Sequence, residues 1–283
     1  MIKVPAHTLA QWALVGLCCL GFPAWTDEAL SESVISVTLP GRTISALATH
    51  RREHDAFRLA VFLLPGHPGI MKIQSADSFG MKGNFLIRSR RHWLDRETLV
   101  LSVDAPSDEW SGFSVSFRAS ERYAEDIRGL VEAIRQQYGT LPLAIVGTSE
   151  GSVSAYYVAK AVKAAKDAKE VQGADIKVVF SSSLFLSSRT SRGLATLDFD
   201  NFPAPMLWVH HASDPCRFTP YREAQRLAEK TGAPLITVQS SNTGRGEPCE
   251  AQSPHGFIGA EVQTVQAMKA WVLSGAVQDV VLP

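Results

Sequence analysis

Residues 143–151 read Leu-Ala-Ile-Val-Gly-Thr-Ser-Glu-Gly, so a short apolar run leads directly into the pattern Gly-x-Ser-x-Gly. A helical pattern of apolar residues follows. This order predicts a strand, a sharp turn and a helix, the context in which a strained turn exposes a nucleophilic serine, here Ser149. Gly147 and Gly151 fit because side chains at these positions would collide where strand and helix approach. The alternative is a Gly/Ser turn that merely caps a helix.

Other apolar runs predict the rest of a sheet. They lie at 58–64, 98–103, 176–180, 206–210 and 235–238. Runs that are apolar at nearly every position suit strands buried on both faces, as in a parallel sheet. Helical spacing of apolar residues occurs at 118–138, 151–170, 221–230 and 261–273. Strands that alternate with helices predict right-handed βαβ crossovers and an α/β fold.

The region before these runs predicts an antiparallel start. Residues 34–39 and 43–49 are β-rich and flank Pro40-Gly41-Arg42, which is typical of a hairpin turn. We therefore expect a mostly parallel sheet of about eight strands, with helices on both faces. Two long irregular connections, 65–97 and 181–205, are of a length that is usually functional or lid-like.

The composition is that of an ordinary globular domain. The chain has 283 residues, is 45% hydrophobic, and balances 28 Lys+Arg against 28 Asp+Glu. This composition excludes a disordered chain, a collagen and a coiled coil. A formal net charge of zero gives no sign of the basic surface that binds nucleic acid. We expect residues 27–283 to form one domain, with 181–205 as a possible short lid.

The first residues have the pattern of an export signal. Lys3 and the amino terminus supply positive charge, and the run from Leu9 to Phe22 is largely apolar. We expect a signal peptide over 1–26, cleaved somewhere within 21–26, and a periplasmic or secreted protein. The run is too short to span a bilayer as a helix, so we expect no stable membrane insertion after its removal.

Removal of the signal leaves two cysteines, Cys216 and Cys249. An even count in a chain bound for an oxidising compartment favours a disulfide. A bridge between residues 33 apart in sequence would stabilise the fold by about 3.7 kcal/mol in the chain-entropy model. The alternative is two buried free thiols.

A serine hydroxyl is a weak nucleophile until a base takes its proton, so an acid and a histidine should follow Ser149 along the chain. Asp214 comes just after the apolar run 206–210, and the carboxyl ends of parallel strands are where such sheets place their sites. His255 lies after the last predicted strand and just before the last helix. We therefore predict Asp214 as the acid and His255 as the base, with an ordinary Asp-Pro turn as the alternative at Asp214.

Acyl transfer also requires donors for the developing oxyanion. The backbone amide of Glu150, directly after the serine at a helix start, is the expected first donor. The second should come from the loop after the 58–64 strand, where Gly66 and His67 precede Pro68; proline has no N–H, so His67 is the better candidate. Tight Pro-Gly turns are the alternative there. No cluster of His, Cys, Asp or Glu has metal-ligand spacing, and we expect no metal and no cofactor.

With these residues in place, the chain resembles the α/β-hydrolase superfamily from about Val34 to the C-terminal helix. Residues 65–69, Pro-Gly-His-Pro-Gly, are similar to the His-Gly-Gly-Pro-Gly stretch of proline iminopeptidase-like members, with His67 in place of the second Gly. The resemblance implies Ser149 as nucleophile, His255 as general base and then acid, and Asp214 as the group that orients His255.

The sequence therefore predicts an exported serine hydrolase that cleaves an ester through an acyl-enzyme, acting on a small-molecule ester or peptide. A serine aminopeptidase or amidase is the first alternative, in which Glu150 would hold the substrate's amine. The second is a catalytically silent fold used for binding. The substrate and the oligomeric state stay open.

Overall fold

One mixed sheet runs through the computed structural model, which describes residues 30–167, 175–187 and 192–283. The predicted signal peptide, 1–26, and the end of the predicted helix at 168–170 lie outside the described residues. The strands of the sheet are β1 (Leu30–Leu39), β2 (Arg42–Arg51), β3 (Leu59–Leu64), β4 (Thr98–Val103), β5 (Leu143–Thr148), β6 (Ile176–Ser181), β7 (Met206–His211), β8 (Leu235–Gln239) and β9 (Val280–Val281).

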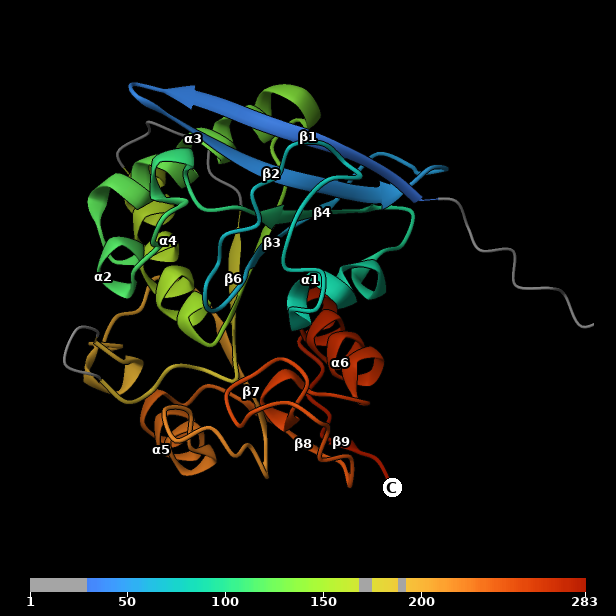
Figure 1. Cartoon of the computed structure of the whole chain (residues 1–283), viewed down its shortest axis with the longest axis vertical. Helices are drawn as coiled ribbons and strands as arrows, with labels where there is room; N and C mark the ends of the chain where they lie inside the picture. Colours follow the sequence, from blue (N-terminus) through green and yellow to red (C-terminus); the bar gives the residue numbers. More distant parts are fainter. Residues whose placement is uncertain (1–29, 168–174, 188–191) are drawn as a thin grey trace, which may run out of the picture.

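The strand order is β1-β2-β4-β3-β5-β6-β7-β8-β9. The hairpin β1-β2 and the pair β2-β4 are antiparallel, and every other neighbouring pair is parallel. The expected parallel sheet with an antiparallel start is thus confirmed. Figure 1 shows the β1-β2 hairpin at one end of the sheet and β7, β8 and β9 at the other.

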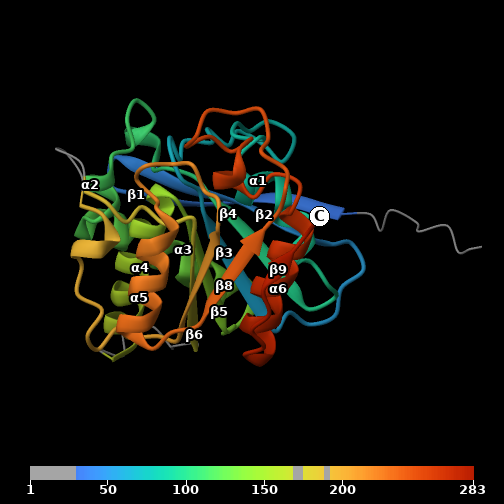
Figure 2. The same cartoon turned by 90° about the horizontal axis from the view of Figure 1, so that it is seen from below.

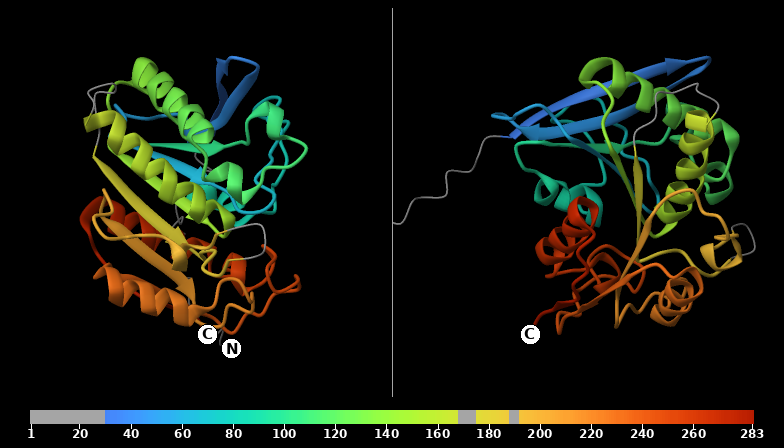
Figure 3. Two further views of the ribbon diagram at one scale, coloured as in Figure 1. Left: turned by 90° about the vertical axis from the view of Figure 1, so that its left-hand side faces the viewer. Right: turned by 180° about the vertical axis from the view of Figure 1, so that it is seen from behind.

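Helices cover both faces of the sheet (Figure 2). They are α1 (Phe85–Ser89), α2 (Val115–Arg118), α3 (Glu121–Tyr138), α4 (Glu150–Asp167), α5 (Tyr221–Thr231) and α6 (Glu261–Ser274). One face carries α3, α4 and α5, which follow one another in chain order in the left view of Figure 3. The opposite face carries α1 and α6.

The alternation of side chains along β3 explains this three-layer arrangement. Phe62 and Leu64 belong to the core shared with α3, α4 and α5, whereas Val61 and Leu63 belong to the core shared with α1 and α6. All six residues of β3 are buried. A strand apolar on both faces is stable only when both faces are covered, so the continuous apolar runs select this architecture.

The structure corrects three details of the sequence prediction. The connection 65–97 is not wholly irregular, because Asn84 caps α1 by accepting a hydrogen bond from the Leu86 amide. The helix predicted at 118–138 begins instead at Glu121, since the Ser120 side chain caps it through the Tyr123 amide. The two-residue strand β9 was not predicted, because so short a run has no periodicity.

The loops that carry the predicted site residues leave the sheet at one edge. Gly66, Ser149 and Asp214 lie within three residues of the ends of β3, β5 and β7, while His255 lies in the longer segment between β8 and α6. These strands are mutually parallel, so their carboxyl ends meet at the same edge. The topology alone therefore brings distant parts of the sequence to one place.

We predict that Phe180→Ala lowers the free energy of unfolding by about 3–5 kcal/mol, because the truncation opens a cavity in an aromatic cluster. Phe180 is 1% exposed, and its ring centroid lies 4.8 Å from Trp208. Denaturant unfolding measures the change. Leu273→Ala, at a position 57% exposed, is the control and should change stability by no more than about 0.5 kcal/mol. Equal effects of the two substitutions would contradict this account of the core.

Candidate active site

Ser149 occupies a sharp turn between β5 and α4 with a backbone φ of 56°, in the left-handed region. Neighbouring glycines make this turn possible. A Cβ on Gly147 would lie 2.2 Å from the Gly151 carbonyl oxygen, and one on Gly151 would lie 2.0 Å from the Leu64 carbonyl oxygen. Both contacts are far below any real Cβ contact, so the packing of helix against strands requires glycine at both positions. A φ of this kind in a non-glycine residue is typical of functional sites.

Backbone hydrogen bonds hold the turn on both sides of Ser149. Its N–H donates to the carbonyl oxygens of Ser181, at 3.2 Å, and Ser182, at 3.1 Å. Its C=O accepts from the Ser152 amide at 3.0 Å and from the Ser152 hydroxyl at 2.6 Å. The main chain of the serine is therefore fixed, and its side chain is the part left to face the pocket described below.

Asp214 and His255 are in direct contact, although they are 41 residues apart in the sequence. The Nδ1 of His255 lies 3.0 Å from Oδ2 of Asp214. Both side chains are buried, at 4% and 0% exposure. With Nδ1 donating to the carboxylate, Nε2 is the ring nitrogen free to accept a proton.

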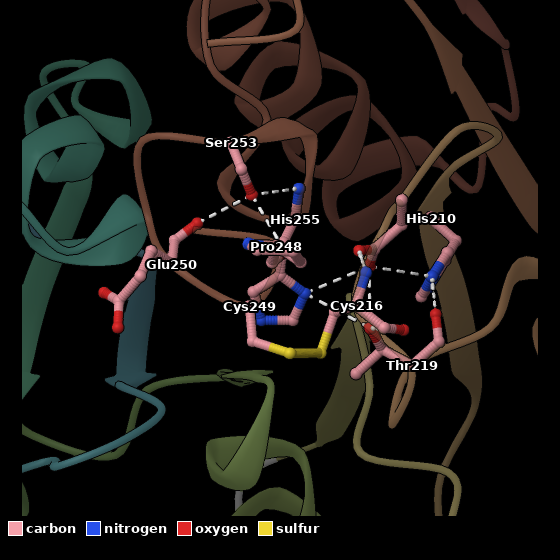
Figure 4. The surroundings of a disulfide bond; sticks show 9 residues. His210, Cys216, Thr219, Pro248, Cys249, Glu250, Ser253 and His255 are labelled. Atoms are coloured by element: carbon pink, nitrogen blue, oxygen red, sulfur yellow. Dashed lines mark hydrogen bonds and ion pairs between the residues drawn. A yellow bond between two sulfur atoms is a disulfide. The ribbon is translucent and has the colours of Figure 1, made fainter. Parts of the chain in front are cut away.

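The Asp214 carboxylate has further donors. Oδ1 accepts the Cys216 amide at 2.9 Å, and Oδ2 accepts the Thr219 hydroxyl at 2.8 Å. Nε2 of His210 lies 3.2 Å from Oδ2 and donates to the Thr219 carbonyl at 2.7 Å. Figure 4 shows His210, Thr219 and His255 close to one another beside the disulfide. Burial raises the pKa of Asp214, but hydrogen bonds from His210 and His255 outweigh it and hold the pKa well below its usual range.

A disulfide ties the two loops that supply these groups. Cys216 lies two residues after Asp214, Cys249 lies six before His255, and the two cysteines are bridged. Within the His255 loop, the Ser253 hydroxyl accepts the His255 amide and donates to the carbonyls of Pro248 and Glu250 (Figure 4). The loops of Asp214 and His255 are thus held together by one covalent bond and a compact set of hydrogen bonds.

Ser149 and His255 line the same pocket, a cavity of about 490 Å³. Apolar side chains supply much of its remaining wall: Met81, Phe85, Leu184 and Phe218. Polar or charged side chains are Asn84, Glu150, Glu250 and Gln252. Of the predicted lid, 181–205, Leu184 reaches this pocket, while Phe185 and Phe199 are buried in the core.

The predicted oxyanion segment also lies at this pocket, which Gly66, His67 and Pro68 line together with Glu150. A Cβ on Gly66 would come within 2.8 Å of the Ser149 Cβ, so the loop lies directly against the nucleophile turn. The His67 side chain is 77% exposed at the mouth of this pocket. The Glu150 amide is at the first residue of α4, where helix N–H groups lack partners within the helix.

Glu150 is a charged side chain next to Ser149, and Arg118 and His67 lie close to its carboxylate. Its Oε2 lies 3.7 Å from Nε of the buried Arg118 and 3.6 Å from Nδ1 of His67. The charge of Arg118, fully buried beneath this wall, therefore offsets that of the carboxylate.

Sequence reasoning missed several residues that build the site. His210 lies only four residues before Asp214 along the chain, and the end of β7 places it against the carboxylate. Asp104, directly after β4, is buried and accepts the amides of Met71, at 2.6 Å, and Ile73, at 2.8 Å, which shapes the loop leading to Met81 and Asn84. Burial raises the pKa of Asp104 against these hydrogen bonds. In the sequence, the only indication that Asp104 shapes this loop is its position directly after an apolar run.

Two kinds of feature, a group of metal ligands and a membrane-spanning helix, are absent from the part of the chain that the structure describes. Across 30–167, 175–187 and 192–283, no three His, Cys, Asp or Glu side chains are grouped as metal ligands. In the same part of the chain, no helix combines the length and the apolar character that a bilayer span requires.

The chain is similar to several solved structures at 13–14% identity. They include a dienelactone hydrolase described as putative from Klebsiella pneumoniae (TM-score 0.56, 13% identity, 87% of this chain and 99% of that one). Est1E from Butyrivibrio proteoclasticus gives a TM-score of 0.55 at 13% identity, over 86% and 98%. A serine hydrolase without a lid from Xanthomonas campestris gives 0.53 at 14% identity, over 83% and 94%.

No protein-family model matches the sequence, and no curated protein is similar enough to match. The neighbours, the strand order and the turn at Ser149 nevertheless agree with the resemblance seen in the sequence. The chain has the α/β-hydrolase fold.

Proposed function

We propose that the protein is a serine hydrolase that cleaves a carboxylic ester through an acyl-enzyme. The observation that carries the proposal is the buried His255–Asp214 pair, 3.0 Å apart, in the pocket that Ser149 lines from its strained turn. Several neighbours of the same fold are serine hydrolases or esterases, which supports this reaction class.

In the proposed reaction, Nε2 of His255 takes the proton of the Ser149 hydroxyl as Oγ bonds to the ester carbonyl carbon. Asp214, ionised and hydrogen-bonded to Nδ1, stabilises the imidazolium that forms. Collapse of the tetrahedral intermediate breaks the bond to the alkoxy group, and His255 returns the proton to the leaving alcohol. Water then repeats the sequence on the acyl-enzyme and releases the acid.

The amides of His67 and Glu150 are the proposed donors to the tetrahedral oxyanion. Both belong to the pocket wall beside Ser149. Each donor of this type typically contributes a factor of about 10²–10³ in kcat. No group other than those of the chain is needed for this step.

The charge around Glu150 favours an ester over a free amino-terminal substrate. An aminopeptidase needs an unpaired anion to hold the substrate's ammonium group, and the buried Arg118 guanidinium already lies 3.7 Å from the Glu150 carboxylate. The apolar walls at Met81, Leu184 and Phe218 suit an uncharged acyl or alkyl group.

Export is part of the proposal. The apolar, positively flanked amino terminus has the pattern of a signal peptide, and the Cys216–Cys249 disulfide is typical of oxidising compartments. We propose a periplasmic or secreted enzyme.

We predict that a fluorophosphonate probe labels the mature protein, and that Ser149→Ala and His255→Ala each abolish labelling. The probe reacts only with an activated serine, so both the nucleophile and its base are required. Gel fluorescence measures the labelling. Ser183→Ala, at a buried serine next to the turn, is the control and should label normally. A folded, bridged sample that does not label would favour the binding-protein alternative.

Turnover of a panel of p-nitrophenyl esters and aminoacyl anilides distinguishes ester hydrolysis from aminopeptidase activity. We predict turnover of short and medium acyl esters, with anilides slower by at least about tenfold, because Glu150 is already paired. Faster turnover of anilides would favour the aminopeptidase.

We predict that reduction of the disulfide lowers activity more steeply than it lowers helix content. The bridge holds the loops of Asp214 and His255 together, and small displacements of catalytic groups cost large factors in rate. Ester turnover and circular dichroism measure the two quantities. The Cys216→Ala/Cys249→Ala double variant should be slow and insensitive to reductant. Equal activity with and without reductant would contradict the prediction.

We predict that the exported protein begins between residues 22 and 27, after cleavage of its signal peptide. Expression of the full chain in a bacterial host, fractionation and amino-terminal sequencing test this. Intact chains that stay in the cytoplasm would refute export and leave the reaction unaffected.

A further inference from the structure

One buried arginine lies beneath the loop that follows β3. Arg118, the last residue of α2, is 1% exposed. Its Nη1 donates to the carbonyl oxygen of Pro65 at 3.1 Å, and its Nη2 donates to those of Gly66, at 3.3 Å, and Pro68, at 3.4 Å. A single guanidinium therefore binds three carbonyls within four consecutive residues.

The other contacts of Arg118 fix the guanidinium in place. Nη1 also donates to the Ser154 hydroxyl of α4 at 3.2 Å, and the guanidinium carbon lies 4.1 Å from the centroid of the Phe113 ring. A Cβ on Gly69 would lie 2.2 Å from Nη2, so the loop closes over the guanidinium at a position where only glycine fits. The loop and the guanidinium are therefore in close contact at Gly69.

Peptide geometry connects Arg118 to the proposed oxyanion donor. The Gly66 carbonyl and the His67 amide belong to one trans peptide, in which C=O and N–H point to opposite sides. Because Arg118 binds the carbonyl from inside the protein, the His67 N–H points away from Arg118. Within the described part of the chain, that N–H has no protein partner. A cation bound to a carbonyl also polarises its peptide and strengthens the N–H as a donor.

We propose that Arg118 is a positioning residue for ester cleavage, which orients and polarises the His67 amide toward the oxyanion without touching the substrate. This inference rests on the proposed function, since it assigns a role within the same reaction. Its distinctive consequence is that the loss of Arg118 weakens binding of the tetrahedral state while leaving binding of the ground state nearly intact.

The test compares Arg118→Met and Arg118→Lys with the wild type on one p-nitrophenyl ester. For Arg118→Met we expect kcat to fall about 10²–10³-fold and KM to change less than about threefold. The inhibition constant of an alkylboronic acid, which forms a tetrahedral adduct with serine, should rise in parallel with the loss of kcat/KM. Arg118→Lys keeps the charge but loses the fork, and should recover part of kcat.

Arg42→Met is the matched control. Arg42 is also a mostly buried arginine, with its side chain 8% exposed and its Nε 2.6 Å from Asp126, but it contacts no loop of the site. Its loss should lower stability and leave kcat and boronate affinity within about threefold of the wild type.

A folded Arg118→Met enzyme with kcat within about fivefold of the wild type would overturn the inference, as would a rise in KM without a fall in kcat. If Arg118→Met does not fold, Gly69→Ala tests the same contact from the loop side, and unchanged boronate affinity there would overturn it as well. Wild-type protein that neither labels with fluorophosphonate nor turns over esters would refute the proposed function and this inference together. An active wild type with unaffected variants would refute the inference alone.

Discussion

The start of α4 packs directly against the ends of β3 and β5, and this close packing determines the arrangement of the site. The Gly151 Cα lies so close to the Leu64 carbonyl that no side chain fits between them. This contact places the turn at Ser149 against the end of β3. The loop that follows β3 then lies against Ser149 at Gly66. The strained φ of Ser149 follows from the same constraint, because the chain must reverse within one residue to enter α4.

Hydrogen bonds and ion pairs, rather than close packing, hold the opposite wall of the site. There a single carboxylate, Asp214, accepts hydrogen bonds from the main chain, from Thr219 and from two histidines. These donors stabilise the ionised form in a buried setting, which an isolated carboxylate would not tolerate. His210 belongs to β7 and His255 to the segment before α6, so the carboxylate joins the end of this strand to that segment.

The sequence could predict the sheet and the order of the three central residues, but not the residues that support them. Continuous apolar runs at β3 to β8 identify strands because burial on both faces leaves a local signature. Ser149 lies within a recognisable motif, Asp214 comes shortly after a predicted strand, and His255 lies between the last predicted strand and the last predicted helix. Arg118, by contrast, belongs in sequence to a helical pattern, and its partners lie 50 to 53 residues away. His210 lies four residues before Asp214, and no motif in the sequence marks it as a partner of the carboxylate, although the turn after β7 brings the two together.

Ser149 and His255 come from separate parts of the chain. Ser149 and the loop at Gly66 precede β6, whereas Asp214, the disulfide and His255 all follow β7. The disulfide therefore joins the loop of Asp214 to the loop of His255 but neither of them to Ser149. In the proposed reaction the Ser149 hydroxyl needs His255 as its base, and a chain folded only as far as α4 has the strained turn without that base. Under this proposal a newly made chain is therefore inactive until the segment after β7 has packed on the sheet.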